Sequence, residues 1–258
     1  MDPITVAILA KNKAHVLPLY LQCLERQTYP ASLIHLYIRT NNNNDDTAAV
    51  LRDWVNRVGH RYAEVFWDDS DVPERVQDYS PHEWNSLRLR VLCRLRQASV
   101  EWAKARNSHY FIADCDNFIQ PDTLETLMNT GLPVIGPLLR NGDDMRSFYS
   151  NYHHRVDSNG YYKASTQYYD ILYQQAKGLI EVEVIHCTYL VRREVLHLAS
   201  YIDGTDRYDY VIFSDTWRKS GIPQYIDNRR LYGKLTFCDT AEEFAAKGIT
   251  FETLGTVG

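Results

Sequence analysis

Short apolar runs rich in β-forming residues alternate with segments of helical periodicity along the first 140 residues of the chain. The first run, Ile4 to Leu9, is continuously apolar, which is typical of a strand buried on both faces of a parallel sheet. The same criteria predict further strands at 33–38, 63–67, 110–113 and 133–139. They predict helices at 16–24, 45–59, 83–105 and 121–128. This alternation predicts an α/β fold with an open, mostly parallel twisted sheet and helices on both faces.

The second half of the chain is less regular. Residues 140–175 are polar and rich in tyrosine, and we interpret them as loops with short strands. A strand is predicted at 181–191, and a helix at 208–219 that Gly221 ends. Since 258 residues with 45% hydrophobic side chains can bury one substantial core, we expect a single domain over 1–258.

Composition limits the classes of partner and compartment. The formal net charge of −5 and a pI of about 6.0 give no overall positive field, so we expect no nucleic-acid partner. No segment reaches transmembrane length. The five cysteines lack CxxC or zinc-ligand spacing, which favours free thiols and a cytoplasmic location. Removal of a leader peptide would leave the same pattern, so the lumen of the endoplasmic reticulum stays open as the alternative.

Polar residues follow three of the predicted strands, where ligands bind in open parallel sheets. They are Lys11-Asn12, the run 41–45, and Asp114-Cys115-Asp116. Two carboxylates one residue apart at a strand exit can share a hard divalent cation, which in turn neutralises a diphosphate. We therefore predict Asp114 and Asp116 as metal ligands, with a helix-capping or turn role as the alternative.

A second triplet of the same form, Asp69-Ser70-Asp71, occurs in a different context. Asp114 ends an apolar strand, whereas Asp69 lies in a charged loop that runs into Pro73. We interpret the second triplet as a solvated loop.

Longer stretches of the sequence resemble a known family. They are VAILAKNKAHVLPLYLQCLERQTYP, HYFIADCDNFIQPDTLETLMNTGLPVIGPLL, and then FYSNY, NGYY, VIHCTYL and YDYVIF through SGI, in that order. Together they resemble the amino-terminal domain of procollagen galactosyltransferases and of the related cerebral endothelial cell adhesion molecule, over roughly 4–233.

The resemblance implies a GT-A glycosyltransferase fold, a UDP-sugar donor and Mn²⁺. It also implies transfer of a hexose, with galactose or glucose favoured, with inversion to a hydroxyl of a protein or glycan acceptor, such as hydroxylysine of a collagen-like protein. The nucleotide-sugar part would then span about 1–140, the acceptor side 141–240 and a C-terminal tail 241–258.

The resemblance also implies donor-site residues by position. Ala10 and Asn12 would line the uridine pocket, although Asn12 fits a strand-end turn equally well, and Cys115 would join Asp114 at the donor. Arg88 would hold uracil or phosphate through its guanidinium. The remaining arginines of the same helix are expected on its solvated face: Arg90, Arg94 and Arg96.

Three further residues fall on family positions. Asn151 lies in the YSN segment, and His186 is either a third metal ligand or a buried histidine bonded to the backbone. Arg230 stands where the family has a late histidine. Its guanidinium can bind a diphosphate but cannot ligate a metal.

An inverting transfer needs a base within reach of the acceptor hydroxyl. Asp209 begins a predicted helix that ends at Gly221, an arrangement in which many GT-A enzymes place this carboxylate. The family has two acids here, whereas this chain has Tyr208-Asp209-Tyr210. Asp209 is therefore the favoured base and Asp215 the alternative.

Two rival functions remain open. The lost acid and the lost histidine favour a catalytically inactive binding or adhesion module with the same fold. A nucleotidyltransferase also uses paired aspartates, but no glycine-rich phosphate loop follows the first strand.

Overall fold

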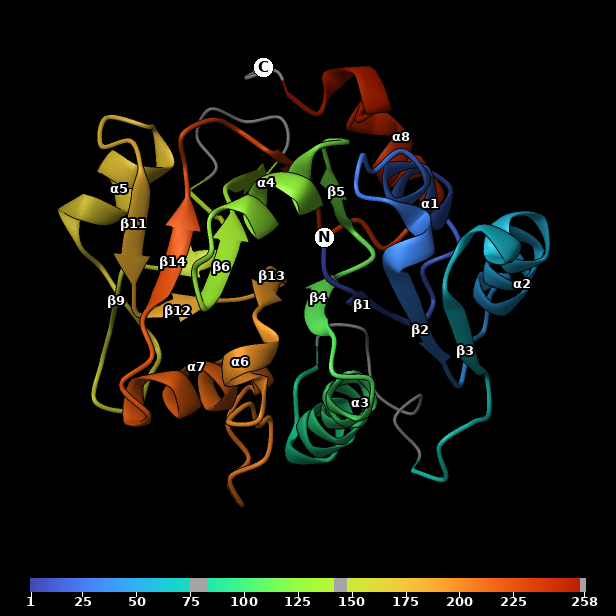
Figure 1. The fold of residues 1–258 in the computed structure, drawn as a ribbon, viewed down its shortest axis with the longest axis horizontal. Helices are drawn as coiled ribbons and strands as arrows, with labels where there is room; N and C mark the ends of the chain where they lie inside the picture. The colour runs from blue at the N-terminus through green and yellow to red at the C-terminus, as the bar shows by residue number, and fades with distance from the viewer. Residues whose placement is uncertain (75–82, 142–147, 256–258) are drawn as a thin grey trace.

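The computed structural model describes residues 1–74, 83–141 and 148–255, and its centre is a twisted eight-stranded sheet (Figure 1). From one edge to the other the strands are β11 (Leu179–Val182), β14 (Gln224–Asp227), β6 (Val134–Pro137), β13 (Thr188–Val191), β4 (His109–Ala113), β1 (Ile4–Ala10), β2 (Ile34–Thr40) and β3 (Glu64–Asp68). Strands from both halves of the chain therefore belong to one sheet.

The sheet is mostly parallel, as the sequence predicts. Strand β1 pairs in parallel with β2 and β4, β2 with β3, and β6 with β14. Strand β13 runs antiparallel to both β4 and β6, and β11 antiparallel to β14. Because β1, β2 and β4 run in the same direction, their carboxyl ends meet at one edge of the sheet.

Helices cover both faces of the sheet (Figure 1). Ile4, Val6 and Ile8 of β1 pack in one buried cluster with α1 (Leu17–Glu25), α2 (Thr47–Val58) and α4 (Thr123–Asn129). Ala7 packs on the opposite face, in a second cluster with α3 (Ser86–Ala105), α6 (Arg193–Leu196) and α7 (Asp209–Lys219). This alternation explains why the first strand is apolar throughout.

The helix boundaries follow local capping chemistry. Helix α2 lies between Asp46 at its N-cap and Gly59 at its C-cap, and the Asp45 carboxylate accepts the first helical N–H at 3.0 Å. Helix α3 starts at Ser86, later than predicted, because the Asn85 side chain accepts the backbone N–H of Arg88 at 3.0 Å. An N-cap side chain of this type satisfies a donor that the helix itself cannot.

The single strand predicted at 181–191 is wrong. The segment contains the end of β11, then β12 (Val184–Ile185), and then β13. Cys187, between the last two, has a φ of 61°, a left-handed conformation that breaks the extended chain. Each piece consequently pairs with a different strand, β12 with β8 (Tyr152–His153) and β13 with β4 and β6.

Other irregular regions contain more structure than the sequence indicated. The predicted strand 133–139 divides into β6 and β7 (Leu139–Asn141), and β7 joins a three-stranded sheet with β15 (Gly233–Leu235) and β5 (Asn117–Ile119). The stretch expected to be loops contains β8, β9 (Arg155–Val156), β10 (Tyr162–Lys163) and helix α5 (Thr166–Leu172). Its residues 142–147, and 75–82 of the predicted acidic loop, lie outside the described residues.

The C-terminal segment packs against the first half of the chain. It contains α8 (Ala241–Ala246), whose Phe244 ring lies 5.4 Å from that of Phe118. Arg26 of the first half lies over the Phe251 ring at 4.2 Å. In the described part of the chain, no helix combines the length and apolar character that a membrane span needs.

Candidate functional site

The loops that follow β1 and β2 are tied to each other. Asn12 donates its backbone N–H to Asn43 Oδ1 at 2.9 Å, and its own Oδ1 accepts the Asn44 N–H at 2.8 Å. Asn12 also has a φ of 53°, which asparagine tolerates better than most residues. Ala10, opposite Thr40, is the last residue of β1. The side chain of Asn12 therefore shapes the strand-end turn and joins the loop after β1 to the loop after β2.

Asp116 leaves the carboxyl end of β4 and pairs with Lys13 from the loop after β1. Lys13 Nζ lies 2.7 Å from Asp116 Oδ2. Burial raises the pKa of Asp116, the charge of Lys13 opposes this rise, and the charge of Asp114 adds to it. Asp116 is thus a partly buried carboxylate whose charge is balanced by a neighbouring cation.

Asp114, the other carboxylate of the triplet, pairs with Arg96 of α3. Arg96 Nη2 donates to Asp114 Oδ1 at 2.7 Å. Arg96 Nε also lies 2.8 Å from Asp209 Oδ2, at an angle outside that of a hydrogen bond. The prediction that Arg96 lies on a solvated helix face is wrong, because its side chain is 8% exposed and joins two carboxylates.

Asp209 is the first residue of α7 and is buried. Burial raises its pKa, the charge of Arg96 opposes the rise, and the charge of Asp114 adds to it. The N-terminal end of a helix favours the ionised form, so the position suits a carboxylate that accepts a proton. The structure therefore brings the favoured base and the Asp114–Asp116 pair together through one arginine.

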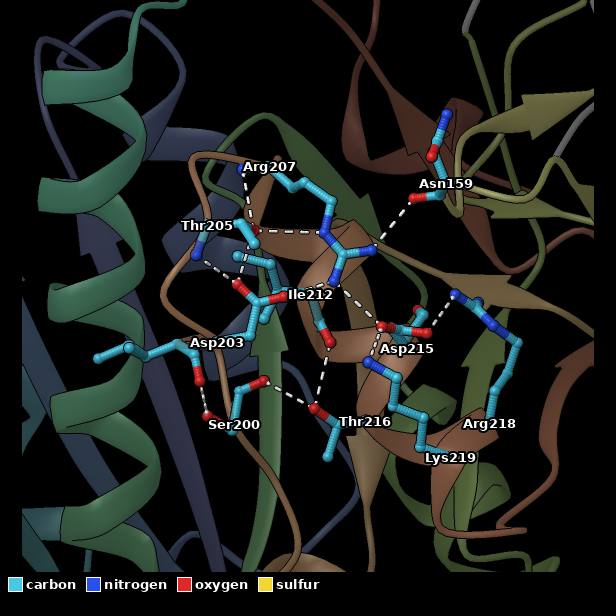
Figure 2. Close-up of polar contacts among 12 residues, drawn as sticks. Asn159, Ser200, Asp203, Thr205, Arg207, Ile212, Asp215, Thr216, Arg218 and Lys219 are labelled. Carbon is cyan, nitrogen blue, oxygen red and sulfur yellow. Dashed lines mark hydrogen bonds and ion pairs between the residues drawn. The ribbon is translucent and has the colours of Figure 1, made fainter.

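Asp215 lies further along α7 in a different setting, as Figure 2 shows. Three cations surround its carboxylate: Arg207 at 3.0 Å, Arg218 at 3.4 Å and Lys219 at 2.7 Å. Burial raises the pKa of Asp215, but hydrogen bonds from Lys219 and Arg207 outweigh burial and lower it. Arg207 also donates to the carbonyl of Asn159 at 3.1 Å. Asp215 therefore anchors loops to α7 and is poorly suited to accept a proton.

Arg88 and Lys11 bring positive charge to the exit of β1. Burial and then the nearby charge of Arg88 lower the pKa of Lys11. Arg88 Nη1 donates to the Glu83 carbonyl at 2.9 Å, and its guanidinium lies 5.1 Å from the centre of the Trp84 ring. Arg90 and Arg94 of the same helix are exposed, as the sequence predicts. The place of Arg88 is compatible with a contact to an anionic donor.

Two other predicted donor residues have partners of their own. The Cys115 side chain is buried in the core and donates to the Leu9 carbonyl at 3.5 Å. Arg230 donates to Gln120 Oε1 at 2.8 Å and to Asp122 Oδ1 at 2.5 Å. A contact between Arg230 and a diphosphate would require it to leave these partners.

His186 is buried in an aromatic cluster. Its ring centre lies 5.0 Å from His153 and 5.2 Å from Tyr210, and its Nδ1 lies 2.9 Å from Cys187 Sγ. Burial, then the charges of His153 and Arg96, lower its pKa well below the usual value. Among the described residues no three His, Cys, Asp or Glu side chains are grouped to hold a metal, so His186 does not complete a three-ligand set with Asp114 and Asp116.

Asn151 has a structural role. Its side chain accepts the Leu139 N–H at 3.1 Å and donates to the Pro137 carbonyl at 2.8 Å, which bridges β6 and β7. The second triplet has loop partners, as expected, since Asp69 pairs with Arg52 and Asp71 accepts the Asn42 N–H at 2.6 Å.

Two residues at the site were not singled out from the sequence, Lys13 and Arg96. Arg96 occupies the position of an apolar residue in the buried stripe of α3, which contains Leu89, Cys93, Val100 and Ala103. Steps of three and four residues are the signature of one helix face. A charged residue within such a stripe indicates a buried ion pair, and this signal could have identified Arg96. Lys13 gave no comparable signal.

The donor set at the triplet matches one kind of metal site. Carboxylate oxygens are the ligands that hard divalent cations prefer, and Mg²⁺-type sites commonly use two carboxylates together with substrate phosphates and water. Asp114 and Asp116 fit this open arrangement. They do not fit a closed site built from protein ligands alone, since no third ligand is grouped with them in the described ranges.

Residues 2–249 match the family described as "Glycosyltransferase family 25, N-terminal domain". The chain belongs to this family. Human procollagen galactosyltransferase 2 is 33% identical over 242 residues, which cover 90% of this chain and 38% of that protein. Human inactive glycosyltransferase 25 family member 3 is 31% identical over 243 residues, covering 90% of this chain and 40% of that protein. The family 25 chain therefore spans about two fifths of the length of these relatives.

Solved structures show the fold of this family 25 chain. S. aureus TarS in complex with UDP-GlcNAc aligns with a TM-score of 0.55 and 12% identity, covering 92% of this chain and 59% of that one. The mannosyltransferase PcManGT from Pyrobaculum calidifontis, in complex with GDP-Man and Mn²⁺, aligns with a TM-score of 0.52 and 12% identity, covering 92% and 57%. These likenesses confirm the predicted GT-A glycosyltransferase fold.

Proposed function

We propose that this chain is the transferase domain of an enzyme that moves a hexose, galactose or glucose, from a UDP-sugar to a hydroxyl acceptor with inversion. The observation that carries the proposal is the placement of Asp209 beside Asp114, joined through Arg96 at 2.8 and 2.7 Å. This puts a proton acceptor next to the two carboxylates that suit a divalent cation. The names of the procollagen galactosyltransferase relatives favour galactose and a collagen-like acceptor.

In this proposal each residue has a defined task. Asp209 accepts the proton of the acceptor hydroxyl, whose oxygen forms a bond to the anomeric carbon as the bond from that carbon to the UDP oxygen breaks. A divalent cation such as Mn²⁺, held by Asp114 and Asp116, would supply neutralisation of the charge on the departing UDP. Arg88 binds the anionic donor from the start of α3.

A second function has specific support. The inactive family 25 member 3 is nearly as similar to this chain as the galactosyltransferases, and this chain has a single acid at Asp209. A module that binds UDP-sugar or a protein partner without transfer would retain the same donor site. The two functions differ in the fate of the donor. A transferase cleaves the UDP-sugar, whereas an inactive module leaves it intact.

The deciding experiment is a screen of UDP-sugars with Mn²⁺ that follows donor hydrolysis and the rise in melting temperature. A transferase hydrolyses one UDP-sugar above background and is stabilised by it, and Asp116→Asn loses both effects. An inactive module is stabilised without hydrolysis. Absence of both effects with every UDP-sugar contradicts a UDP-sugar site. Circular dichroism of Asp116→Asn checks that its fold is retained.

A further inference from the structure

Hydrogen bonds hold the backbone of Lys13 in place, and a flexible stem carries its ammonium group to Asp116. Its N–H donates to Thr47 Oγ1 at 2.7 Å, and its carbonyl accepts the N–H groups of Val16 at 3.1 Å and Leu17 at 3.0 Å. Its ammonium reaches Asp116 Oδ2 at the end of a four-carbon stem with several rotatable bonds. The head group can therefore change partner without any movement of the loop.

The two cations at the carboxylate pair differ in their freedom to leave. Arg96 is 8% exposed and also pairs with Asp209, so its departure would leave the Asp114 and Asp209 carboxylates close together without the cation between them. The side chain of Lys13, which pairs with Asp116, is 26% exposed. If one cation gives way to a ligand, Lys13 does so at the lower cost.

Charge balance shows when Lys13 would move. Asp114, Asp116 and Asp209 carry three negative charges against the two positive charges of Arg96 and Lys13, so a divalent cation alone would change the net charge of the site from −1 to +1. A divalent cation that arrives with a diphosphate brings no net charge. Binding of the two together would free the Lys13 ammonium from Asp116, and the phosphate oxygens of the diphosphate would then be available to accept hydrogen bonds from it.

We propose that Lys13 is an exchangeable counter-ion, which pairs with Asp116 in the free protein and with the diphosphate of the donor in the complex. It thereby makes the binding of divalent cation and of UDP cooperative. This inference rests on the proposed function, since it takes Asp114 and Asp116 as the site of the cation. It adds Lys13 to the residues that bind the UDP-sugar donor, and it gives a reason why the binding of the cation and of the nucleotide would be coupled.

The test compares Mn²⁺ and UDP binding in wild type and Lys13→Met, which keeps the stem and removes the charge. Titration calorimetry measures UDP affinity with and without Mn²⁺, and the electron paramagnetic resonance signal of free Mn²⁺ measures metal affinity without UDP. We expect Lys13→Met to bind Mn²⁺ alone about tenfold more tightly and UDP with Mn²⁺ about tenfold more weakly, within the usual range of coupling between sites.

Two further variants make the result specific. Lys13→Arg keeps a cation on a flexible stem, so it should recover cooperativity between Mn²⁺ and UDP. Lys104→Met removes a comparable lysine–carboxylate pair, 2.9 Å from Glu101 on α3, and should change neither affinity. Thermal unfolding of all variants checks that they are folded.

Weaker Mn²⁺ binding by Lys13→Met, or unchanged UDP affinity, overturns the inference. If wild type hydrolyses a UDP-sugar and Lys13→Met binds both ligands as wild type does, the inference fails while the proposed function stands. If wild type binds no UDP in the presence of Mn²⁺, both fail.

Discussion

Arg96 Nη2 donates to Asp114 Oδ1 at 2.7 Å, and this bond joins the middle of α3 to the carboxyl end of β4. The same guanidinium lies 2.8 Å from Asp209 at the start of α7. One buried cation thus holds three elements in register at the edge of the sheet. Removal of one partner from a buried ion pair is costly because the other charge is left without compensation.

We predict that Arg96→Met lowers the free energy of unfolding by about 3–5 kcal/mol, the usual cost of an uncompensated buried charge. Arg94→Met, from the same helix, removes the exposed pair with Glu74 and should cost less than about 1 kcal/mol. Urea unfolding followed by circular dichroism measures both. Equal stabilities of the two variants would show that the Arg96 pairs contribute nothing beyond those of a surface arginine.

The sequence was sufficient for elements whose pattern is local. Periodicity and capping residues were enough to predict three elements. They are β1, the helix between Asp46 and Gly59, and the strand that ends just before Asp114. The triplet Asp114-Cys115-Asp116 follows from its place at a strand exit. These features depend on neighbours in the sequence, so a single sequence contains the information.

Features that depend on distant partners were missed. The apolar stripe of α3 indicates that Arg96 is buried, but only the fold brings its partners Asp114 and Asp209 to it. The segment 181–191 is apolar enough for one strand, but the positive φ of Cys187 divides it between two sheets. Helix α5 has only 7 residues, and a helix of this length is stable only when it packs against a core that the rest of the chain supplies.

We predict that Arg88→Ala weakens UDP binding by about 1.5–3 kcal/mol, the usual contribution of a hydrogen bond to a charged group. Arg88 lies near Lys11 at the exit of β1, where an anionic donor would bind. Arg94→Ala, whose guanidinium pairs with Glu74 at 2.6 Å, should leave UDP affinity unchanged. Calorimetric titration with UDP in the presence of Mn²⁺ measures both variants. Equal losses from both would assign the effect to the overall charge of α3.

We predict that acid destabilises the protein through its buried histidines. Burial lowers the pKa of His153 from 6.5 to about 4, so the unfolded state takes up the proton first as the pH falls. The contribution of His153 is therefore complete above about pH 6.5 and is lost as the pH falls toward 4, by up to about 1.4 kcal/mol per pH unit.

Urea unfolding of His153→Gln at several pH values tests this expectation. The variant should lose less stability than wild type between pH 6.5 and 4, whereas His60→Gln, at an exposed position, should follow wild type. A pH dependence in His153→Gln as steep as that of wild type would assign the acid sensitivity to other groups.

The assignment of the base makes opposite predictions for two aspartates of one helix. Asp209 is near Asp114 with its pKa raised by burial, whereas Asp215 is surrounded by Arg207, Arg218 and Lys219. We expect Asp209→Asn to lower turnover by about 10²-fold or more with little change in UDP-sugar affinity, because the amide cannot accept the proton. Asp215→Asn should retain turnover and lose stability, because Arg207, Arg218 and Lys219 lose a carboxylate that they share.

Transfer rates, donor affinities and urea unfolding of Asp209→Asn and Asp215→Asn separate the two roles. A loss of turnover confined to Asp215→Asn would move the base assignment to that residue. If both variants of an active enzyme retain turnover, neither carboxylate removes the acceptor proton. The base must then be sought in the region 140–175. The comparison is informative because both aspartates belong to α7, so a general disturbance of that helix would lower the stability of both variants alike.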